Sequence, residues 1–199
     1  GASRGIGKAV TKALLEAGTI VIGTAKNAEG LESLTQNFSP RYPGQFSSIP
    51  ADLTLDEDVQ NLCVTIQKEI GELDIIINNA GILFFEFLTD ITDEMLMSSF
   101  AINVFAPIKI CHHFVPAMIQ KKWGRIINVG SSSAYNGGGT PKHCIYSSTK
   151  HALLGFTRAL DEEVREHNIR VGIMSPAGVA TDMVNGLDHI PTDSLMSPA

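Results

Sequence analysis

The 199-residue chain is 44% hydrophobic and carries a formal net charge of −6, so it can bury one sizeable core and lacks the basic surface that nucleic-acid binding favours. No stretch reaches the ~18–20 unbroken apolar residues of a membrane span, and no secretory signal pattern opens the chain. The three scattered cysteines fit reduced thiols better than a disulfide framework, so we expect a cytoplasmic globular protein with no membrane or nucleic-acid partner.

A glycine-rich turn opens the chain, with Gly1, Gly5 and Gly7 leading directly into a helical pattern over 8–17. Glycines in such a turn permit positive φ and close approach of a pyrophosphate, and the helix N-terminus offers N–H groups to phosphates. By its spacing alone the segment is weak evidence, because an ordinary turn can have the same glycines. The prediction of a dinucleotide site therefore needs support from the rest of the chain.

Short β-branched runs alternate with helical patterns over the rest of the chain. The expected strands are 19–25, 45–49, 73–78, 124–129 and 169–174, and the expected helices are 8–17, 59–66, 93–121 and 146–167. Thr54 and Glu57 are spaced as a capping box for the second helix, and Pro107 and Pro116 are expected to bend the third. The alternation predicts right-handed βαβ units and a doubly wound parallel sheet, the Rossmann fold of the α/β class.

Three further motifs follow the glycine turn in a fixed order. They are Asn-Asn-Ala-Gly at 78–81, Tyr-Ser-Ser-Thr-Lys at 146–150 and Pro-Ala-Gly-Val-Ala-Thr at 176–181. Over essentially all of residues 1–185 this set resembles the short-chain dehydrogenase/reductase family of the classical type, and in particular its 3-oxoacyl-acyl-carrier-protein reductases. The resemblance implies an oxidoreductase that moves hydride between NADP(H) and a small-molecule carbonyl or secondary alcohol.

Tyr146 and Lys150 are four residues apart and share one face of a helix. A nearby ammonium stabilises a phenolate, so we expect Lys150 to lower the pKa of Tyr146 from ~10 toward neutral pH. The resemblance implies that Tyr146 is the acid/base, that Lys150 also binds the nicotinamide ribose, and that Asn103 supports a water relay to this lysine. It also implies a serine that holds the substrate oxygen; Ser131 matches the pattern best, and Ser132 is the alternative.

The choice of cofactor depends on the end of the 19–25 strand. A carboxylate there would bind the ribose 2′-OH, but this chain has Thr24 and Lys26, with Arg4 in the glycine turn, which favours NADP(H) over NAD(H). Lys26 is also compatible with a solvated loop lysine, and Asp52 with a helix cap. The resemblance implies a cofactor-binding set of Gly1, Ser3, Arg4, Ile6, Thr24, Lys26, Asp52, Leu53, Asn78, Ala80, Tyr146, Lys150, Val179 and Thr181. At Ala177 the family usually has glycine, and an alanine there would be strained if its φ were positive.

We interpret 1–199 as a single dinucleotide-binding catalytic domain, a fragment that lacks the first strand and the C-terminal strand, with 182–199 beginning a substrate lid. The alternatives are a non-catalytic dinucleotide-binding sensor and an inactive truncated form on the same fold. No metal site is expected at Cys111-His-His113, because adjacent helical residues point in different directions. The apolar side chains of Phe84, Phe85, Phe87 and Leu88 could line an acyl or aromatic pocket, although packing in the core or between subunits is favoured. The resemblance implies a homodimer or homotetramer.

Overall fold

The computed structural model describes residues 1–135, 140–183 and 195–198, and its chain divides into two compact units. The first unit comprises Gly1–Leu53 with Gly178–Ala199, and the second comprises Thr54–Ala177. All five predicted strands form and run parallel. They pair in two sheets, of order β1-β2 in the first unit and β3-β4-β5 in the second. The single-domain organisation stays a prediction.

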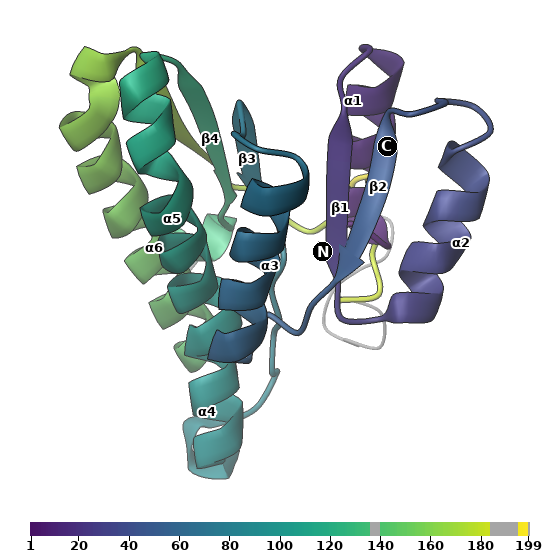
Figure 1. Ribbon diagram of the computed structural model, residues 1–199. Coiled ribbons are helices and arrows are strands. Elements are labelled where there is room, and N and C mark those ends of the chain that lie inside the picture. The colour runs from purple at the N-terminus through teal and green to yellow at the C-terminus, as the bar shows by residue number, and fades with distance from the viewer. Residues whose placement is uncertain (136–139, 184–194, 199) are drawn as a thin grey trace. The chain divides into compact units, whose positions relative to one another are not determined.

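The first unit is built from α1 (Gly5–Glu16), β1 (Val21–Ala25), α2 (Ala28–Phe38) and β2 (Phe46–Pro50) (Figure 1). Its core joins Leu15 of α1, Leu34 and Phe38 of α2, and Phe46 of β2, so both helices cover the same face of the two strands. The helix α2 was not among the predicted helices. Two features of the sequence indicate it: the N-cap residue Asn27, which accepts a hydrogen bond from the Gly30 N–H at 2.9 Å, and apolar residues at helical spacing.

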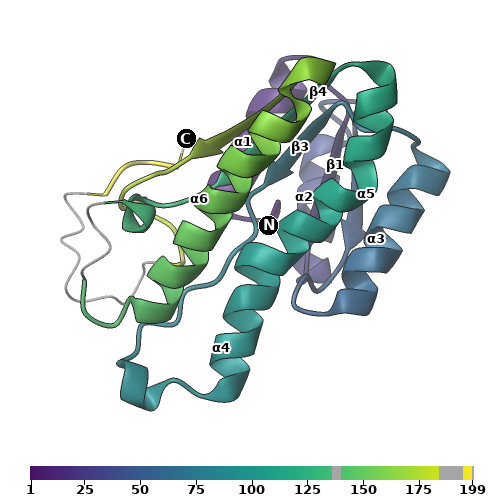
Figure 2. The ribbon, with the colours of Figure 1, turned by 90° about the vertical axis from the view of Figure 1, so that its left-hand side faces the viewer.

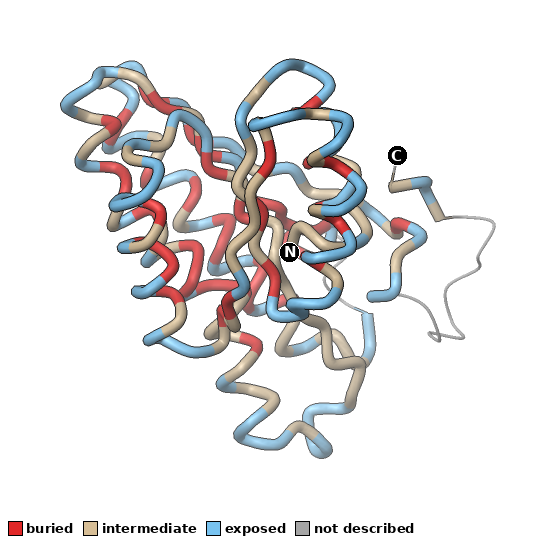
Figure 3. The backbone as a smooth tube through the Cα atoms, turned by 45° about the vertical axis from the view of Figure 1, so that its right-hand side comes forward, coloured by how far each residue is buried: buried red, intermediate tan, exposed pale blue. Residues whose placement is uncertain are grey.

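The second unit places three strands under a layer of helices. Its strands are β3 (Ile75–Asn78), β4 (Gly124–Val129) and β5 (Ile169–Met174), and its helices are α3 (Asp56–Glu69), α4 (Asp93–Phe100), α5 (Ala106–Lys121) and α6 (Cys144–Val164). The helix α6 packs on β5, α5 packs on β4 and α3, and α5 and α6 lie side by side (Figures 1 and 2). Buried positions recur at helical spacing along α5 and α6 (Figure 3). The carboxyl ends of β3 and β4 carry the motifs at 78–81 and 128–131.

The capping box predicted for α3 was wrong. Leu55, and not Thr54, takes the N-cap position, and the leucine side chain cannot cap the helix. Three acidic residues in the first turn, Asp56, Glu57 and Asp58, place negative charge at the positive end of the helix dipole instead.

The 93–121 segment forms a continuous helix interrupted by a π-helical turn, η2 (Ala101–Phe105), between α4 and α5. Pro107 follows the turn at once and has no N–H to donate to the carbonyl of Asn103, which accounts for the break in α-helical bonding. Pro116 lies inside α5. By length and composition this helix could cross a membrane, but it packs against α3 and α6 and buries Asn103, as a core helix does.

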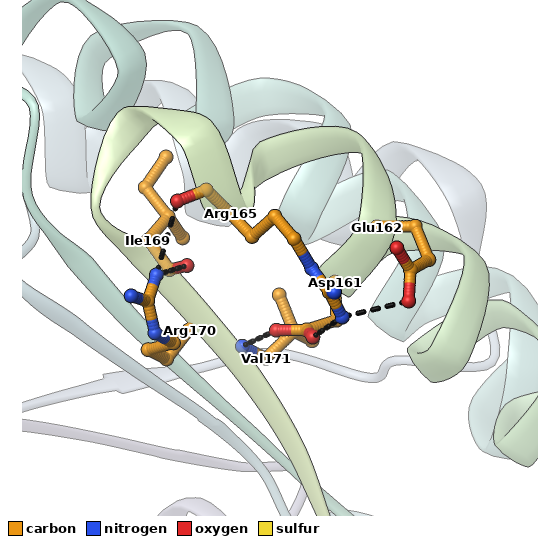
Figure 4. A network of polar contacts seen from close by, with 6 residues as sticks. All are labelled: Asp161, Glu162, Arg165, Ile169, Arg170 and Val171. Carbon is orange, nitrogen blue, oxygen red and sulfur yellow. Dashed lines mark hydrogen bonds and ion pairs between the residues drawn. The ribbon is translucent and has the colours of Figure 1, made fainter.

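A network of polar contacts ties the end of α6 to the start of β5 (Figure 4). One oxygen of Asp161 accepts from the Val171 N–H at 2.9 Å, and the other pairs with Arg165 at 2.9 Å. These bonds lower the pKa of Asp161. Arg170 donates to the carbonyl oxygens of Arg165 and Ile169. The network fixes where β5 begins, and β5 in turn leads to the motif at 176–181.

We predict that Asp161→Ala lowers the free energy of unfolding by about 1–2 kcal/mol, because it leaves the Val171 N–H without its hydrogen-bond acceptor. The matched control is Glu162→Ala, which removes only an exposed ion pair with Arg165 and should cost less than about 0.5 kcal/mol. Urea unfolding of both variants measures the difference. Equal losses in the two variants would contradict the role given to the Asp161 hydrogen bond.

Candidate active site

Lys150 lies in the interior of the second unit, with only 4% of its surface exposed. Its Nζ donates a hydrogen bond to the Val129 carbonyl, at the end of β4, at 2.9 Å. Burial disfavours the ammonium and lowers the pKa of Lys150 to about 8. A lysine with this pKa changes its protonation close to neutral pH, so it can take part in proton movement.

Tyr146 lies next to this lysine, with the centre of its ring 5.6 Å from the Lys150 Nζ. Burial raises the pKa of Tyr146, and a hydrogen bond from the Ser131 hydroxyl opposes the rise. We expected the Lys150 ammonium to lower this pKa, and the structure corrects that expectation. Both groups are desolvated, and desolvation disfavours the phenolate as well as the ammonium. Tyr146 is therefore a neutral phenol over the physiological pH range.

Of the two candidate serines, Ser131 is the one that hydrogen-bonds Tyr146. Ser131 is buried, and its Oγ also accepts from the Ser133 N–H at 3.1 Å, which fixes the hydroxyl. Ser132 is exposed and donates its backbone N–H to the Pro176 carbonyl at 3.0 Å. The geometry thus brings Ser131 and Tyr146 together.

Asn103 lies in the π-helical turn and is 1% exposed, and its side-chain amide forms three hydrogen bonds. Its Oδ1 accepts from the Ile82 N–H at 2.9 Å, and its Nδ2 donates to the Ile82 carbonyl at 3.0 Å and to the Thr149 Oγ1 at 3.1 Å. Thr149 in turn donates to the Tyr146 carbonyl at 2.7 Å. Asn103 therefore ties the loop after β3 to the helical turn that carries Tyr146 and Lys150. Thr149 was missed from sequence, although a threonine in a helix commonly donates to a carbonyl in the preceding turn.

Gly81 is the second residue that the sequence analysis did not single out. A Cβ at this position would lie 2.9 Å from the Asn103 Oδ1 and 3.6 Å from the Lys150 Nζ. The backbone passes this closely to the Asn103 amide only because the residue is glycine.

Asn78, predicted to contact the cofactor, uses its side chain inside the protein. Its Nδ2 donates to the Asn128 Oδ1 at 2.8 Å, and the Asn128 Nδ2 donates to the Thr157 Oγ1 at 2.9 Å. Asn78 also bonds Cys111 at 3.6 Å. This buried chain of amides joins β3, β4 and α6, so the role of the Asn78 side chain is to hold the strands that carry the site.

In the first unit, the glycine turn leads into α1 as predicted. Gly5 has a φ of +53°, and a Cβ there would meet the Thr181 methyl group at 3.0 Å. The Ala2 N–H donates to the Thr24 carbonyl at 2.9 Å, which holds the turn against the end of β1. Arg4 is the N-cap of α1, and its side chain makes no capping hydrogen bond to the first turn. Those N–H groups can therefore bind a phosphate.

Both cations that favoured NADP(H) have acidic partners in the first unit. Lys26 pairs with Asp52 at 2.7 Å, which raises the pKa of Lys26, and Arg4 pairs with Asp182 at 3.1 Å. The cations are exposed, and exposed pairs contribute little, so an arriving phosphate could displace them. The Thr24 Oγ1 lies beside this region and is buried without a hydrogen-bond partner among the described residues.

The other residues predicted to bind the cofactor differ in how far they are buried. All of them lie in the first unit except Ala80, which is in the loop after β3. Leu53 and Val179 are buried, and Val179 bridges to Met196. Gly1, Ser3, Ile6 and Ala80 are half-buried. Ala177 has no positive φ, so the strain considered for it does not arise. Most of the predicted lid at 182–199 and the glycines at 137–139 lie outside the described residues. Within the described ranges, no cluster of His, Cys, Asp and Glu could hold a metal ion.

The comparisons with known proteins agree on one family. The family model described as short chain dehydrogenase matches residues 1–190. The chain is 31% identical over 187 residues to 3-oxoacyl-acyl-carrier-protein reductase FabG of Haemophilus influenzae, covering 94% of the chain and 75% of that protein. It is 32% identical over 187 residues to carbonyl reductase family member 4 of Xenopus laevis, with 94% and 76% covered.

Two solved structures have a similar fold. A short-chain dehydrogenase from Streptomyces avermitilis matches with a TM-score of 0.84 and 29% identity, over 92% of this chain and 65% of that one. A metagenomic short-chain oxidoreductase in complex with NADP matches with a TM-score of 0.83 and 30% identity, over 90% and 79%. These likenesses and the parallel sheets confirm the α/β Rossmann fold. The chain spans about three quarters of the length of the curated relatives.

We predict that Gly81→Ala lowers kcat at least tenfold, because the added Cβ displaces the Asn103 amide that holds the turn of Tyr146 and Lys150, and small misplacements of reacting groups have large kinetic costs. The matched control is Gly155→Ala in α6, where a Cβ meets nothing within 4 Å among the described residues. Steady-state kinetics of both variants test this. Wild-type kcat in Gly81→Ala would show that the close approach is unimportant.

We predict that Lys150 makes stability depend on pH. Its folded pKa of about 8 lies below its ordinary 10.5, so between these values the unfolded chain binds one more proton. Its contribution to stability is therefore fully present above pH 10.5 and is lost as the pH falls through about 8. The free energy of unfolding at pH 7 and pH 10, compared between the wild type and Lys150→Met, isolates this contribution. An identical pH dependence in both proteins would refute it.

Proposed function

The chain belongs to the short-chain dehydrogenase family of oxidoreductases, and we propose that it transfers hydride between NADP(H) and a carbonyl or secondary alcohol. In this proposal the reacting groups are Ser131, Tyr146 and Lys150, with Asn103 in support. The observation that carries it is the hydrogen bond between Ser131 and Tyr146 beside a buried lysine. A non-catalytic sensor, the alternative considered from sequence, would have no use for this arrangement.

The state of Tyr146 favours carbonyl reduction as the working direction. When bound, NADPH supplies the hydride that reduces the carbonyl carbon. A phenol whose pKa is raised stays protonated, so Tyr146 can donate its proton to the carbonyl oxygen as negative charge develops there. The Ser131 hydroxyl can donate a hydrogen bond to the same oxygen and stabilise that charge.

Lys150 and Asn103 support the proton transfer. With a pKa of about 8, Lys150 is mostly protonated at neutral pH and can return a proton toward Tyr146 after turnover. Asn103 holds the helical turn of Tyr146 through Thr149. The backbone carbonyl of Asn103 lies four residues before Pro107, which has no N–H to donate to it. This carbonyl can therefore accept a hydrogen bond from a water on the relay to Lys150.

The first unit fits a phosphate-bearing dinucleotide. The uncapped N-terminus of α1 suits the pyrophosphate, and the buried Thr24 hydroxyl is a polar atom that a bound cofactor could satisfy. Arg4 and Lys26 would hold the 2′-phosphate in place of their carboxylate partners. The complex of the metagenomic relative with NADP supports this choice of cofactor. A homo-oligomeric state and a cytoplasmic location stay predictions.

We predict that Tyr146→Phe lowers kcat for carbonyl reduction by about 10²–10⁴-fold, because it removes the general acid. Ser131→Ala should lower kcat by about 10²–10³-fold, because it removes a donor to the developing oxyanion. Ser132→Ala is the matched control and should stay within a few-fold of the wild type. NADPH oxidation over a panel of ketones and aldehydes measures all three.

Two outcomes would contradict the proposal. Unchanged turnover in Tyr146→Phe would remove this residue from the mechanism. A preference for NADH over NADPH of tenfold or more in kcat/KM (about 1.4 kcal/mol) would contradict the cofactor assignment.

A further inference from the structure

A row of aromatic rings runs from the catalytic tyrosine to a lysine in the second unit. The His143 ring lies 6.1 Å from the Tyr146 ring, and the Phe85 ring lies 5.2 Å from that of His143, edge to face. The Lys142 Nζ lies 5.2 Å from the centre of the Phe85 ring and 4.9 Å from that of Phe87. The row therefore begins at the reacting phenol and ends at an ammonium.

The backbone of Lys142 is unusual. Its φ is +65°, a conformation that side-chain-bearing residues adopt at a cost. The other described non-glycine residues with positive φ, Lys122 and Asn168, are C-caps of helices, where this conformation is the ordinary way to end a helix. Lys142 instead follows Pro141 in a turn that a hydrogen bond from the His143 N–H to the Thr140 carbonyl closes at 3.3 Å. A turn with proline in its second position can take a positive φ in its third, so the turn sets the backbone of Lys142 just before α6.

The ammonium of Lys142 retains hydrogen-bonding capacity. Among the residues that the structure describes, it forms neither an ion pair nor a hydrogen bond, even with Glu86 between the two phenylalanines. Ring faces attract the charge but do not exhaust the three N–H donors of an ammonium. The rings hold the lysine in place while it stays able to bind an anion.

We propose that Lys142, Phe85 and Phe87 form the acid-binding end of the substrate site. The substrate is then a carbonyl compound with an acidic group, carboxylate or phosphate, separated from the carbonyl by an apolar stretch that lies along His143 and Phe85. A protein of net charge −6 repels anions on average, so a local cation is what an acidic substrate requires. This inference rests on the proposed function, because Tyr146 fixes the position of the carbonyl.

The test compares oxo carboxylic acids of increasing chain length with their methyl esters, which differ in charge and hardly in shape. With NADPH, we expect the wild type to favour one acid over its ester by about tenfold or more in kcat/KM, which is the size of a charge-assisted hydrogen bond. Lys142→Gln should lose this preference through a higher KM for the acid. Lys142→Arg should keep the preference for the acid. The kcat/KM of an oxoalkyl phosphate, compared with that of the oxo acid, shows which of the two acidic groups the site prefers.

The matched control is Lys122→Gln, which removes the same charge from a residue with a similar φ at the end of α5. It should keep the wild-type preference for the acid. Equal kcat/KM for every acid and its ester in the wild type, or a preference that survives in Lys142→Gln, would overturn the inference.

Calorimetry of the binding of the same acids tests the role of Lys142 independently of the proposed reaction. In Tyr146→Phe protein, the acid should bind at least tenfold more weakly once Lys142→Gln is added, and an unchanged Kd would overturn the inference. The binding result decides the role of Lys142 even if no carbonyl compound is reduced, an outcome that would count against the proposed function alone.

Discussion

The arrangement of the second unit follows from the burial of one ammonium group. Moving a lysine ammonium out of water costs several kcal/mol unless a polar group compensates, and here the Val129 carbonyl does so at 2.9 Å. To reach that carbonyl, α6 packs closely on β5, and the absence of a side chain at Gly81 leaves room for the Asn103 amide beside it. Asn103 then closes the site by bonding both the loop after β3 and Thr149.

This burial also sets the protonation states of Lys150 and Tyr146. In water, lysine is the stronger base and would hold its charge beside a tyrosine. In the interior both groups are driven toward their neutral forms, so the pKa of Lys150 falls and that of Tyr146 rises. The tyrosine therefore starts as a proton donor, and the lysine exchanges protons near neutral pH. The attraction between the Lys150 ammonium and a Tyr146 phenolate, taken without desolvation, would lower the pKa of Tyr146.

The polar groups beside the reacting residues belong to two kinds. Asn78, Asn128 and Thr157 bond one another in the interior and hold the strands, so their polarity serves the fold. Ser131 bonds Tyr146, and Lys142 faces aromatic rings, so neither takes part in this buried chain of amides. An exposed pair such as Arg4 with Asp182 can exchange partners at little cost, whereas the buried amides cannot.

The sequence by itself determined the strands, most helices and the family, because apolar periodicity and the order of the motifs are local properties of the chain. It also placed Tyr146 and Lys150 on one face of a helix, since four residues make about one turn. Only the tertiary structure decided that Ser131 rather than Ser132 bonds Tyr146, that Asn78 turns inward, and that Thr149 and Gly81 belong to the site. Those outcomes depend on distances between β3, β4 and α6, and on burial, neither of which is encoded in any one segment of the chain.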